Sequence, residues 1–219
     1  MKLNVVQQML EGLYRISVDY AVEDFVITDP ELARRLDASA NPRENREKLL
    51  LAQQGDEVHL SLYLDAAILE RLAEDCPLDA LHGDNLEDFL LALEGVSHFL
   101  YVSWNAGFDR GVTLLELEMQ AEVDKYVLAS SLFAKQRRDL PPAQLWRCLF
   151  DSPSFDRALD GEERSRYADA SHYAGRFCFQ LEHQFLKKNR NSEMMTELRK
   201  FYRMTQTGKI SHINAAYAA

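Results

Sequence analysis

The sequence predicts an α+β fold that is predominantly helical, and two observations indicate it. Apolar and polar residues alternate from Val58 to Asp65, which is typical of a strand buried on one face. Nearly all of the chain after Asp84 instead places apolar residues at helical spacing. We therefore expect a small, antiparallel sheet near the N-terminus, followed by a multi-helix C-terminal part that contains an antiparallel helical hairpin.

These patterns divide the chain into two parts, which can pack as one domain. Residues 1–80 form the expected α+β part, and residues 84–208 form the expected helical part. Residues 209–219 carry no structural signal and are a candidate mobile tail.

Helix and strand signals alternate along the N-terminal part. The dipeptides Asp29-Pro30 and Asn41-Pro42 each pair a favourable N-cap residue with proline at the first helical position, so each predicts the start of a helix. Residues 14–28 are rich in Val, Ile, Tyr and Phe and predict a strand. The expected order is a helix at 3–13, a strand at 14–28, a helix at 30–36, a helix at 42–54, a strand at 58–64 and a helix at 66–74.

Capping patterns mark the helices of the C-terminal part. Asp84 with Glu87, and Asp160 with Glu163, each place an acid three residues after a favourable N-cap residue. Pro141-Pro142 interrupts the helical pattern between them. The expected helices are 86–104, 110–133, a short helix around Trp146, 161–188, and a last helix from Ser192 to about Gly208.

The composition is that of a globular chain with an excess of acid. Of the 219 residues, 47% are hydrophobic, which can support a core, and the net charge is −10. This charge argues against general nucleic-acid binding, because such proteins displace counterions from phosphates with Lys and Arg. Residues 184–219 nevertheless carry seven Lys or Arg against two Glu, a net of +5. That basic end can be a docking site for an acidic partner or RNA, a solvated helix face, or a segment that packs on its own acidic body.

Cysteine spacing and hydropathy favour a reducing compartment. Cys76, Cys148 and Cys178 are odd in number, far apart and without CxxC spacing, so they predict neither a disulfide framework nor a zinc ribbon. The first residues lack the long apolar run of a secretory signal, and no stretch approaches the roughly 20 apolar residues that span a bilayer. We therefore expect a cytoplasmic protein that does not bind membranes.

Acids and a histidine recur at one-turn spacing on the two helices of the expected hairpin. The first helix carries Glu94 and His98, and the second carries Glu118 and Glu122. Counting outward from Gly107 brings the two pairs opposite each other. Carboxylates and imidazoles on facing helices hold metals in helical bundles, so these four residues are candidate ligands of a divalent iron, manganese or zinc ion. The alternative is buried hydrogen bonding or a solvated charged face, since the spacing from Glu to His is four rather than three.

A second candidate site lies on the helix expected at 161–188. His172, Arg176 and His183 line up on one face around Phe179. Two imidazoles and a guanidinium can bind a small anion such as a phosphate or a carboxylate. The same residues can equally be surface groups on a long helix.

No catalytic sequence motif decides the function, and whether the chain is an enzyme stays open. The HExxH, GxSxG and glycine-rich phosphate-binding patterns are all absent. We expect a protein that acts by binding a protein partner or by self-association, for instance as a homodimer. One alternative is a metal-dependent helical enzyme that uses Glu94, His98, Glu118 and Glu122. The other is a protein that binds a small anionic ligand on the 161–188 helix.

Overall fold

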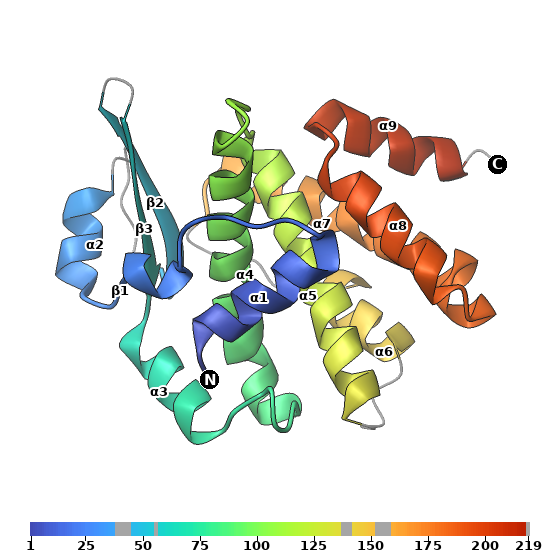
Figure 1. The fold of residues 1–219 in the computed structure, drawn as a ribbon, viewed down its shortest axis with the longest axis horizontal. Helices are drawn as coiled ribbons and strands as arrows, with labels where there is room; N and C mark the ends of the chain where they lie inside the picture. Colours follow the sequence, from blue (N-terminus) through green and yellow to red (C-terminus); the bar gives the residue numbers. More distant parts are fainter. Residues whose placement is uncertain (38–44, 55–56, 137–141, 152–158, 218–219) are drawn as a thin grey trace.

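The computed structural model, which describes residues 1–37, 45–54, 57–136, 142–151 and 159–217, has a small sheet with helices on both of its faces (Figure 1). The helices of these residues are α1 (Leu3–Tyr14), α2 (Pro30–Leu36), α3 (Ala66–Glu74), α4 (Gly83–Ala106), α5 (Leu114–Lys135), α6 (Pro142–Trp146), α7 (Gly161–Gln184), α8 (Asn191–Tyr202) and α9 (Gln206–Tyr217). The strands are β1 (Val26–Ile27), β2 (Glu47–Gln54) and β3 (Glu57–Leu64). Figure 1 shows α2 outside the sheet, α4 on the opposite side of it, and most of the other long helices beyond α4. The predicted, predominantly helical α+β fold is confirmed.

The sheet has the strand order β1-β3-β2. Strands β2 and β3 are antiparallel, with Leu49 opposite Leu62. The two residues of β1 instead run parallel to β3, with Val26 opposite Leu62. The expected antiparallel pairing is therefore confirmed for β2 and β3, while the short β1 makes the sheet mixed.

Strand β2 replaces most of the helix predicted at 42–54, so that prediction is wrong. The strand pairs with β3 along its whole length. Its alternate side chains reach two cores, because Leu49 packs in the main core and Leu50 packs with Tyr63 on the side of α2. Pairing with a strand that follows in the chain thus outweighs the local helical signal. The start signal itself, Asn41-Pro42, lies outside the described residues.

The strand predicted at 14–28 is also mostly wrong, because only the two residues of β1 are strand. Arg15 has a left-handed backbone, with φ of 51°, that ends α1, and residues 22–25 form a 3-10 helix. The Gln7 side chain accepts a hydrogen bond from the Val22 backbone N–H at 2.8 Å and donates one back to a carbonyl of the same segment. A side chain of α1 thus takes the place of a strand partner.

Helix α4 is the centre of the molecule. It packs against α1, α3, α5, β2 and β3. Its apolar side chains Phe89, Leu93, Val96 and Phe99 are fully buried, in agreement with the nearly continuous apolar pattern of its sequence. A polar side chain near the middle of this helix is consequently removed from bulk water. No helix in the described part of the chain combines the length and the apolar character that crossing a bilayer requires.

Helices α4 and α5 contact each other along their length. Their hydrogen-bonded pairs include Tyr101–Glu116 at 2.5 Å, Ser97–Asp124 at 2.5 Å and Glu94–Lys125 at 3.0 Å. In these pairs the residue number on α5 increases as the residue number on α4 decreases. The two helices therefore run in opposite directions, and side chains from the middle of each face one another.

The basic C-terminal segment packs on the body of the protein. Helix α8 contacts α1. Arg199 donates a hydrogen bond to the Leu13 carbonyl at 2.9 Å, and Arg203 donates one to the Tyr14 carbonyl at 3.1 Å. These contacts correspond to the expectation of a basic segment that packs on its own body.

Residues 206–217 form a further helix, α9, in the region of the candidate mobile tail. Gly208, which we expected to end the last helix, lies inside α9, so that boundary is wrong. Lys209 and Ile213 are fully buried. Up to residue 217 this segment is thus helical and packed against α7.

Candidate metal centre

Strand β2 and helices α4 and α5 bring together six ionisable side chains, which we name the hairpin cluster. They are Glu47 from β2, Glu94 and His98 from α4, and Glu118, Glu122 and Lys125 from α5. Members on the same helix are three or four residues apart from the next, so they share a face. All six are buried or half-buried. The antiparallel packing of α4 and α5 thus concentrates charge in the interior.

Three members of the cluster, Glu47, Glu94 and His98, have the spacing of metal ligands, and we name them the donor triad. Each offers one ligand atom, and the three atoms all lie within 4.8 Å of one another. Atoms that bind one ion at about 2.0–2.2 Å lie at most about 4.4 Å apart. In a tetrahedral arrangement such atoms lie about 3.3–3.6 Å apart, so the donor triad would have to contract by up to about 1 Å to hold an ion.

His98 lies between two carboxylates. Its Nδ1 is 3.6 Å from Glu47 Oε1, and its Nε2 is 3.5 Å from Glu118 Oε2. All three side chains are more than nine-tenths buried, with 6%, 9% and 9% of their surface exposed. Both distances exceed those of good hydrogen bonds. Among the described residues, neither Glu47 Oε1 nor His98 Nε2 has a hydrogen-bond partner, which is uncommon for buried polar atoms.

Lys125 contacts two further acids of the cluster. Its Nζ lies 3.0 Å from Glu94 Oε2 and 2.5 Å from Glu122 Oε1. Burial opposes the ionisation of Glu94, but Lys125 and His98 outweigh burial and hold the pKa of Glu94 below its usual range. The ammonium is thus held between two acids, and of these it holds the pKa of Glu94 low.

Burial and charge shift the pKa values of the remaining groups. Burial disfavours protonated His98, but Glu118 and Glu47 outweigh burial and hold the pKa of His98 well above its usual range. Burial raises the pKa of Glu47 against the opposing effect of His98. Burial likewise raises the pKa of Glu122 against the charge of Lys125. The hairpin cluster thus holds four acids against Lys125 and one histidine, an excess of acid that a divalent cation would relieve. Binding of a metal would release the proton of His98, because an imidazole binds a metal only in its neutral form.

Gly95 allows the sheet to approach α4 closely. A Cβ built at this position would lie 2.7 Å from Leu62 Cδ1 and 3.1 Å from Glu47 Oε1. Because glycine has no side chain, β2 can place Glu47 directly beside His98, which is one turn from Glu94 on the same helix.

Helix α7 brings Tyr167 to the same region. Burial raises the pKa of Tyr167, and the charges of Glu118, Glu94 and Glu47 raise it further. Helix α7 packs along α5, which carries Glu118. The carboxylates of the hairpin cluster are thus near enough to Tyr167 to raise the pKa of its phenol.

The four hairpin residues predicted as ligands all belong to the cluster, and their role in metal binding stays a prediction. Glu94 and His98 belong to the donor triad, whereas Glu118 contacts His98 and Glu122 contacts Lys125. Sequence reasoning missed Glu47, because a helix was predicted there. Recognition of β2 as a strand could have found it, since Glu47 then shares a face with the apolar residue two positions on.

The residues of the second candidate site lie along α7 and have separate contacts. Arg176 donates a hydrogen bond at 2.9 Å to Asn214 of α9. His183 Nε2 lies 2.8 Å from Lys187 Nζ, and His172 is exposed. Anion binding by these three residues stays a prediction.

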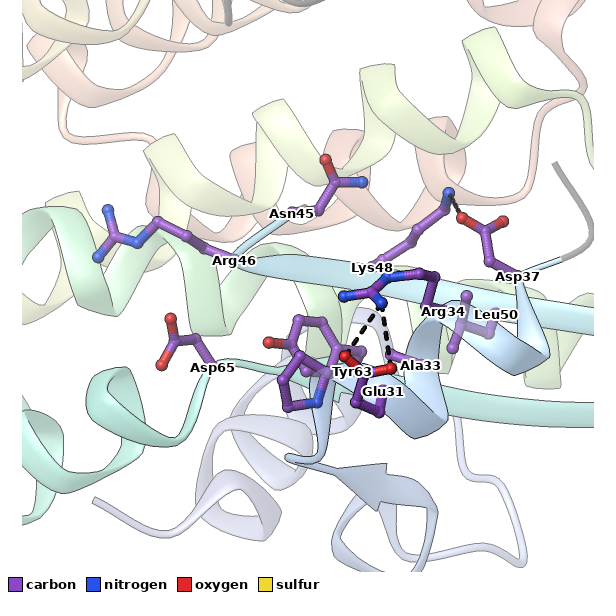
Figure 2. A pocket seen from close by; sticks show the side chains of 11 residues that line it. Glu31, Ala33, Arg34, Asp37, Asn45, Arg46, Lys48, Leu50, Tyr63 and Asp65 are labelled. Carbon is purple, nitrogen blue, oxygen red and sulfur yellow. Dashed lines mark hydrogen bonds and ion pairs between the residues drawn. The ribbon is translucent and has the colours of Figure 1, made fainter. Parts of the chain in front are cut away.

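A cavity of about 530 Å³ lies on the α2 side of the sheet. Figure 2 shows Arg34 directed at Glu31 and Lys48 directed at Asp37 along this cavity. Lys48 follows Glu47 in β2, so the pleat directs the two side chains to opposite faces of the sheet. The three basic groups that line the cavity, Arg34, Arg46 and Lys48, all pair with acids, whereas Glu47 Oε1 of the hairpin cluster has no hydrogen-bond partner among the described residues.

No protein-family model, no curated protein and no solved structure matches this chain. Its function is therefore inferred from the side chains that the fold brings together. The hairpin cluster is the strongest basis, because it combines convergent donors, unpartnered buried atoms and an excess of acid.

Proposed function

We propose that the chain is a metal-dependent enzyme whose donor triad, Glu47, Glu94 and His98, binds a divalent metal ion. The proposal is carried by the convergence of the donor triad around Glu47 Oε1, a buried oxygen that has no hydrogen-bond partner among the described residues and lies within a cluster rich in acids. A buried polar atom without a partner costs about 1–3 kcal/mol. A cation at the triad would give the Glu47 oxygen a partner and would offset the excess of negative charge.

The donor set suits a transition metal. Two carboxylates supply hard oxygen ligands, and one imidazole supplies a nitrogen of intermediate softness. Mn(II), Fe(II) and Zn(II) all accept this combination.

We assign Glu118 a positioning role instead of a role as a ligand. His98 Nδ1 faces Glu47 of the triad, so Nε2 is the nitrogen that faces Glu118. A histidine that binds a metal commonly donates its other N–H to a carboxylate, which fixes the ring and raises its basicity. In this assignment Glu122 contributes by pairing with Lys125.

The chemistry that this site supports best is activation of water. Three protein ligands leave open positions on a divalent ion for water and substrate. Such an ion lowers the pKa of bound water, so that hydroxide forms near neutral pH, and it polarises a substrate oxygen.

Metal content tests the proposal. The protein would be purified without a histidine tag from medium supplemented with manganese, iron and zinc, and its metals would be measured by mass spectrometry. Wild type should carry near-stoichiometric metal. Glu47→Gln, Glu94→Gln and His98→Asn should each lower the bound metal by about tenfold or more, because each removes a ligand.

Glu87→Gln is the matched control. Glu87 lies two turns before Glu94 on α4, but it is exposed and pairs with Arg46 at 2.6 Å. This variant should keep the metal of wild type. Wild type that stays free of metal, or triad variants that fold by circular dichroism and keep their metal, would contradict the proposal.

A second candidate function, self-association or binding of a protein partner, is supported by exposed apolar side chains. Phe108 is 67% exposed and Leu114 is 57% exposed, and both lie where α4 connects to α5. Exposed apolar side chains mark a protein interface where they gather on one part of the surface, and these two lie at the same end of the helical hairpin.

Light scattering tests the self-association. Wild type should form a dimer that Phe108→Ser/Leu114→Ser converts to a monomer. Tyr20→Ser is the control, because Tyr20 is also 57% exposed but lies in a different part of the fold. A wild type that remains monomeric at high concentration would exclude self-association.

A further inference from the structure

We infer that the metal centre of this protein holds one ion, because the Lys125 ammonium fills the position that a second ion would take. We take the donor triad of the proposed function as the site of the first ion. Acids alone would not define that site. Glu47 Oε1, on a side chain more than nine-tenths buried, accepts no hydrogen bond among the described residues and faces His98 Nδ1 at 3.6 Å, so the triad presents a free oxygen and a nitrogen to the same place.

The hairpin cluster has enough donors for two ions. Dinuclear centres in helical bundles use four carboxylates and two imidazoles from facing helices, and paired ions lie about 3.5–4 Å apart. The cluster likewise has four carboxylates, from Glu47, Glu94, Glu118 and Glu122, together with one imidazole. Its composition alone would therefore be compatible with a dinuclear site.

Lys125 separates these acids into two groups. Glu94 belongs to the donor triad, and its Oε2 also lies 3.0 Å from Lys125 Nζ. Glu122 Oε1 lies 2.5 Å from the same nitrogen. In the part of the chain that the structure describes, the donors that converge are those of the triad, and Glu122 lies outside them. The ammonium thus sits between the acid that binds the first ion and the acid that a second ion would require.

The surroundings of Lys125 make its charge difficult to replace. Its side chain is 11% exposed and contacts two carboxylates, so a second ion at this place would have to displace a buried cation that is paired with two acids. An ammonium is a compact charge with three donors, and Lys125 directs it at both acids. A second divalent ion at this place would meet the ammonium at close range and be repelled.

Manganese stoichiometry of a Lys125→Gln variant tests this assignment. Glutamine can still hydrogen-bond to Glu94 and Glu122 but carries no charge. After loading with Mn(II) alone and desalting, we expect one ion per chain in wild type and two in Lys125→Gln. The double variant Glu122→Gln/Lys125→Gln lacks an acid of the second position and should return to one ion. Lys135→Gln, at the exposed end of α5, is the matched control and should keep one ion.

Electron paramagnetic resonance of the Mn(II)-loaded wild type gives a second readout that needs no variant. A single Mn(II) ion gives a six-line spectrum, whereas two ions that share a carboxylate give an exchange-coupled spectrum. We expect the six-line spectrum. This measurement decides whether wild type holds one ion or two, even where Lys125→Gln does not fold.

The outcomes separate this inference from the proposed function. Two manganese ions in wild type, or an exchange-coupled spectrum, would overturn the single-ion assignment and leave the proposed function intact. One ion in both wild type and a folded Lys125→Gln would show that Lys125 does not fill a second position. If wild type binds no manganese, and loading with zinc and with iron also fails, both the single-ion assignment and the proposed function are overturned.

Discussion

Gly95 determines how closely the sheet approaches the donor triad. A side chain at this position would meet Leu62 of β3, which is fully buried, and Glu47 of β2. Relief of this contact needs the buried Leu62 and Glu47 side chains to repack or the sheet to shift, and either change would displace Glu47. Glycine inside a helix costs about 1 kcal/mol relative to alanine, so α4 gives up helix stability here in exchange for the close approach.

Gly95→Ala should lower both stability and metal content. Overpacking of a core costs about 1–3 kcal/mol, and the better helix propensity of alanine offsets about 1 kcal/mol of that cost. We expect a net loss of free energy of unfolding in urea. We also expect less bound metal, since Glu47 would move away from His98.

Gly83→Ala is the matched control on the same helix. Gly83 is the first residue of α4, and a Cβ there would meet nothing within 4 Å. This variant should be as stable as wild type or more stable by about 0.5 kcal/mol. Equal stability of Gly95→Ala and Gly83→Ala would show that the sheet accommodates the extra carbon without cost, against our expectation.

At the scale of elements, the sequence predicts the helices whose signals are local. Helix α3 has the bounds expected from the sequence, 66–74, and Asp65 caps it by accepting a hydrogen bond from the Ala67 N–H at 2.8 Å. Helix α7 begins at the expected capping box, where Asp160 accepts a hydrogen bond from the Glu163 N–H at 2.8 Å. In both cases the interacting groups lie within three residues of one another, so the sequence alone contains the whole interaction.

Elements that depend on distant partners were not predictable in the same way. Strand β2 forms because β3 pairs with it and α4 packs on it, and neither contact is visible in residues 42–54. The start of α4 also differs from the prediction, although its contacts are local. We expected a cap at Asp84, but His82 and Asn85 form it, and the Asn85 side chain also donates to the Ala80 carbonyl at 2.9 Å.

One part of the candidate site was likewise predictable from the sequence, and another part was not. A short connection between two predicted helices places His98 opposite a residue near 116, and the structure pairs His98 with Glu118. The hairpin half of the site was therefore accessible to counting. Glu47 could not be found by counting, because its position depends on strand β2, which the local sequence does not predict. Its position also depends on Gly95, whose contact with the sheet is known only from the folded structure.

At the scale of the molecule, a second set of buried polar groups ties the ends of the chain to the hairpin. Asp124 of α5 accepts hydrogen bonds from Tyr14 of α1, from Ser97 of α4 at 2.5 Å and from Gln120 at 2.9 Å. Gln120 in turn accepts one from Lys209 of α9 at 2.6 Å. Four helices that are far apart in sequence thus share one network, which favours a single cooperative unit.

Lys209 is the group of this network that is most costly to bury. It is fully buried, and its Nζ lies 4.6 Å from the ring centre of Tyr101 and 4.9 Å from that of Phe201. Burial lowers the pKa of Lys209 to about 7, against the charges of Glu116 and Asp124, which raise it. Near neutral pH the folded protein therefore tends to release a proton that the unfolded chain keeps.

This difference should make the stability of the whole protein depend on pH above neutrality. The pKa of an unfolded lysine is about 10.4, so from about pH 7 to pH 10 the unfolded chain binds more protons at this position than the folded protein. Stability then rises with pH, by about 1.4 kcal/mol for each unit, or about 2–3 kcal/mol between pH 7 and pH 9. Lys209→Met removes the titrating group and should remove this part of the rise.

Urea unfolding of wild type and Lys209→Met across this pH range measures the effect, with Lys200→Met on the exposed face of α8 as the control. Methionine also leaves Gln120 without its donor, but that loss is the same at every pH and therefore does not change the slope. Lys200→Met should keep the slope of wild type. If Lys209→Met also keeps the slope of wild type, the buried amine retains its proton, and Glu116 and Asp124 then outweigh burial. A shallower slope of stability against pH in Lys209→Met means that α9 is held to the helical core by an amine that is largely neutral in mild alkali.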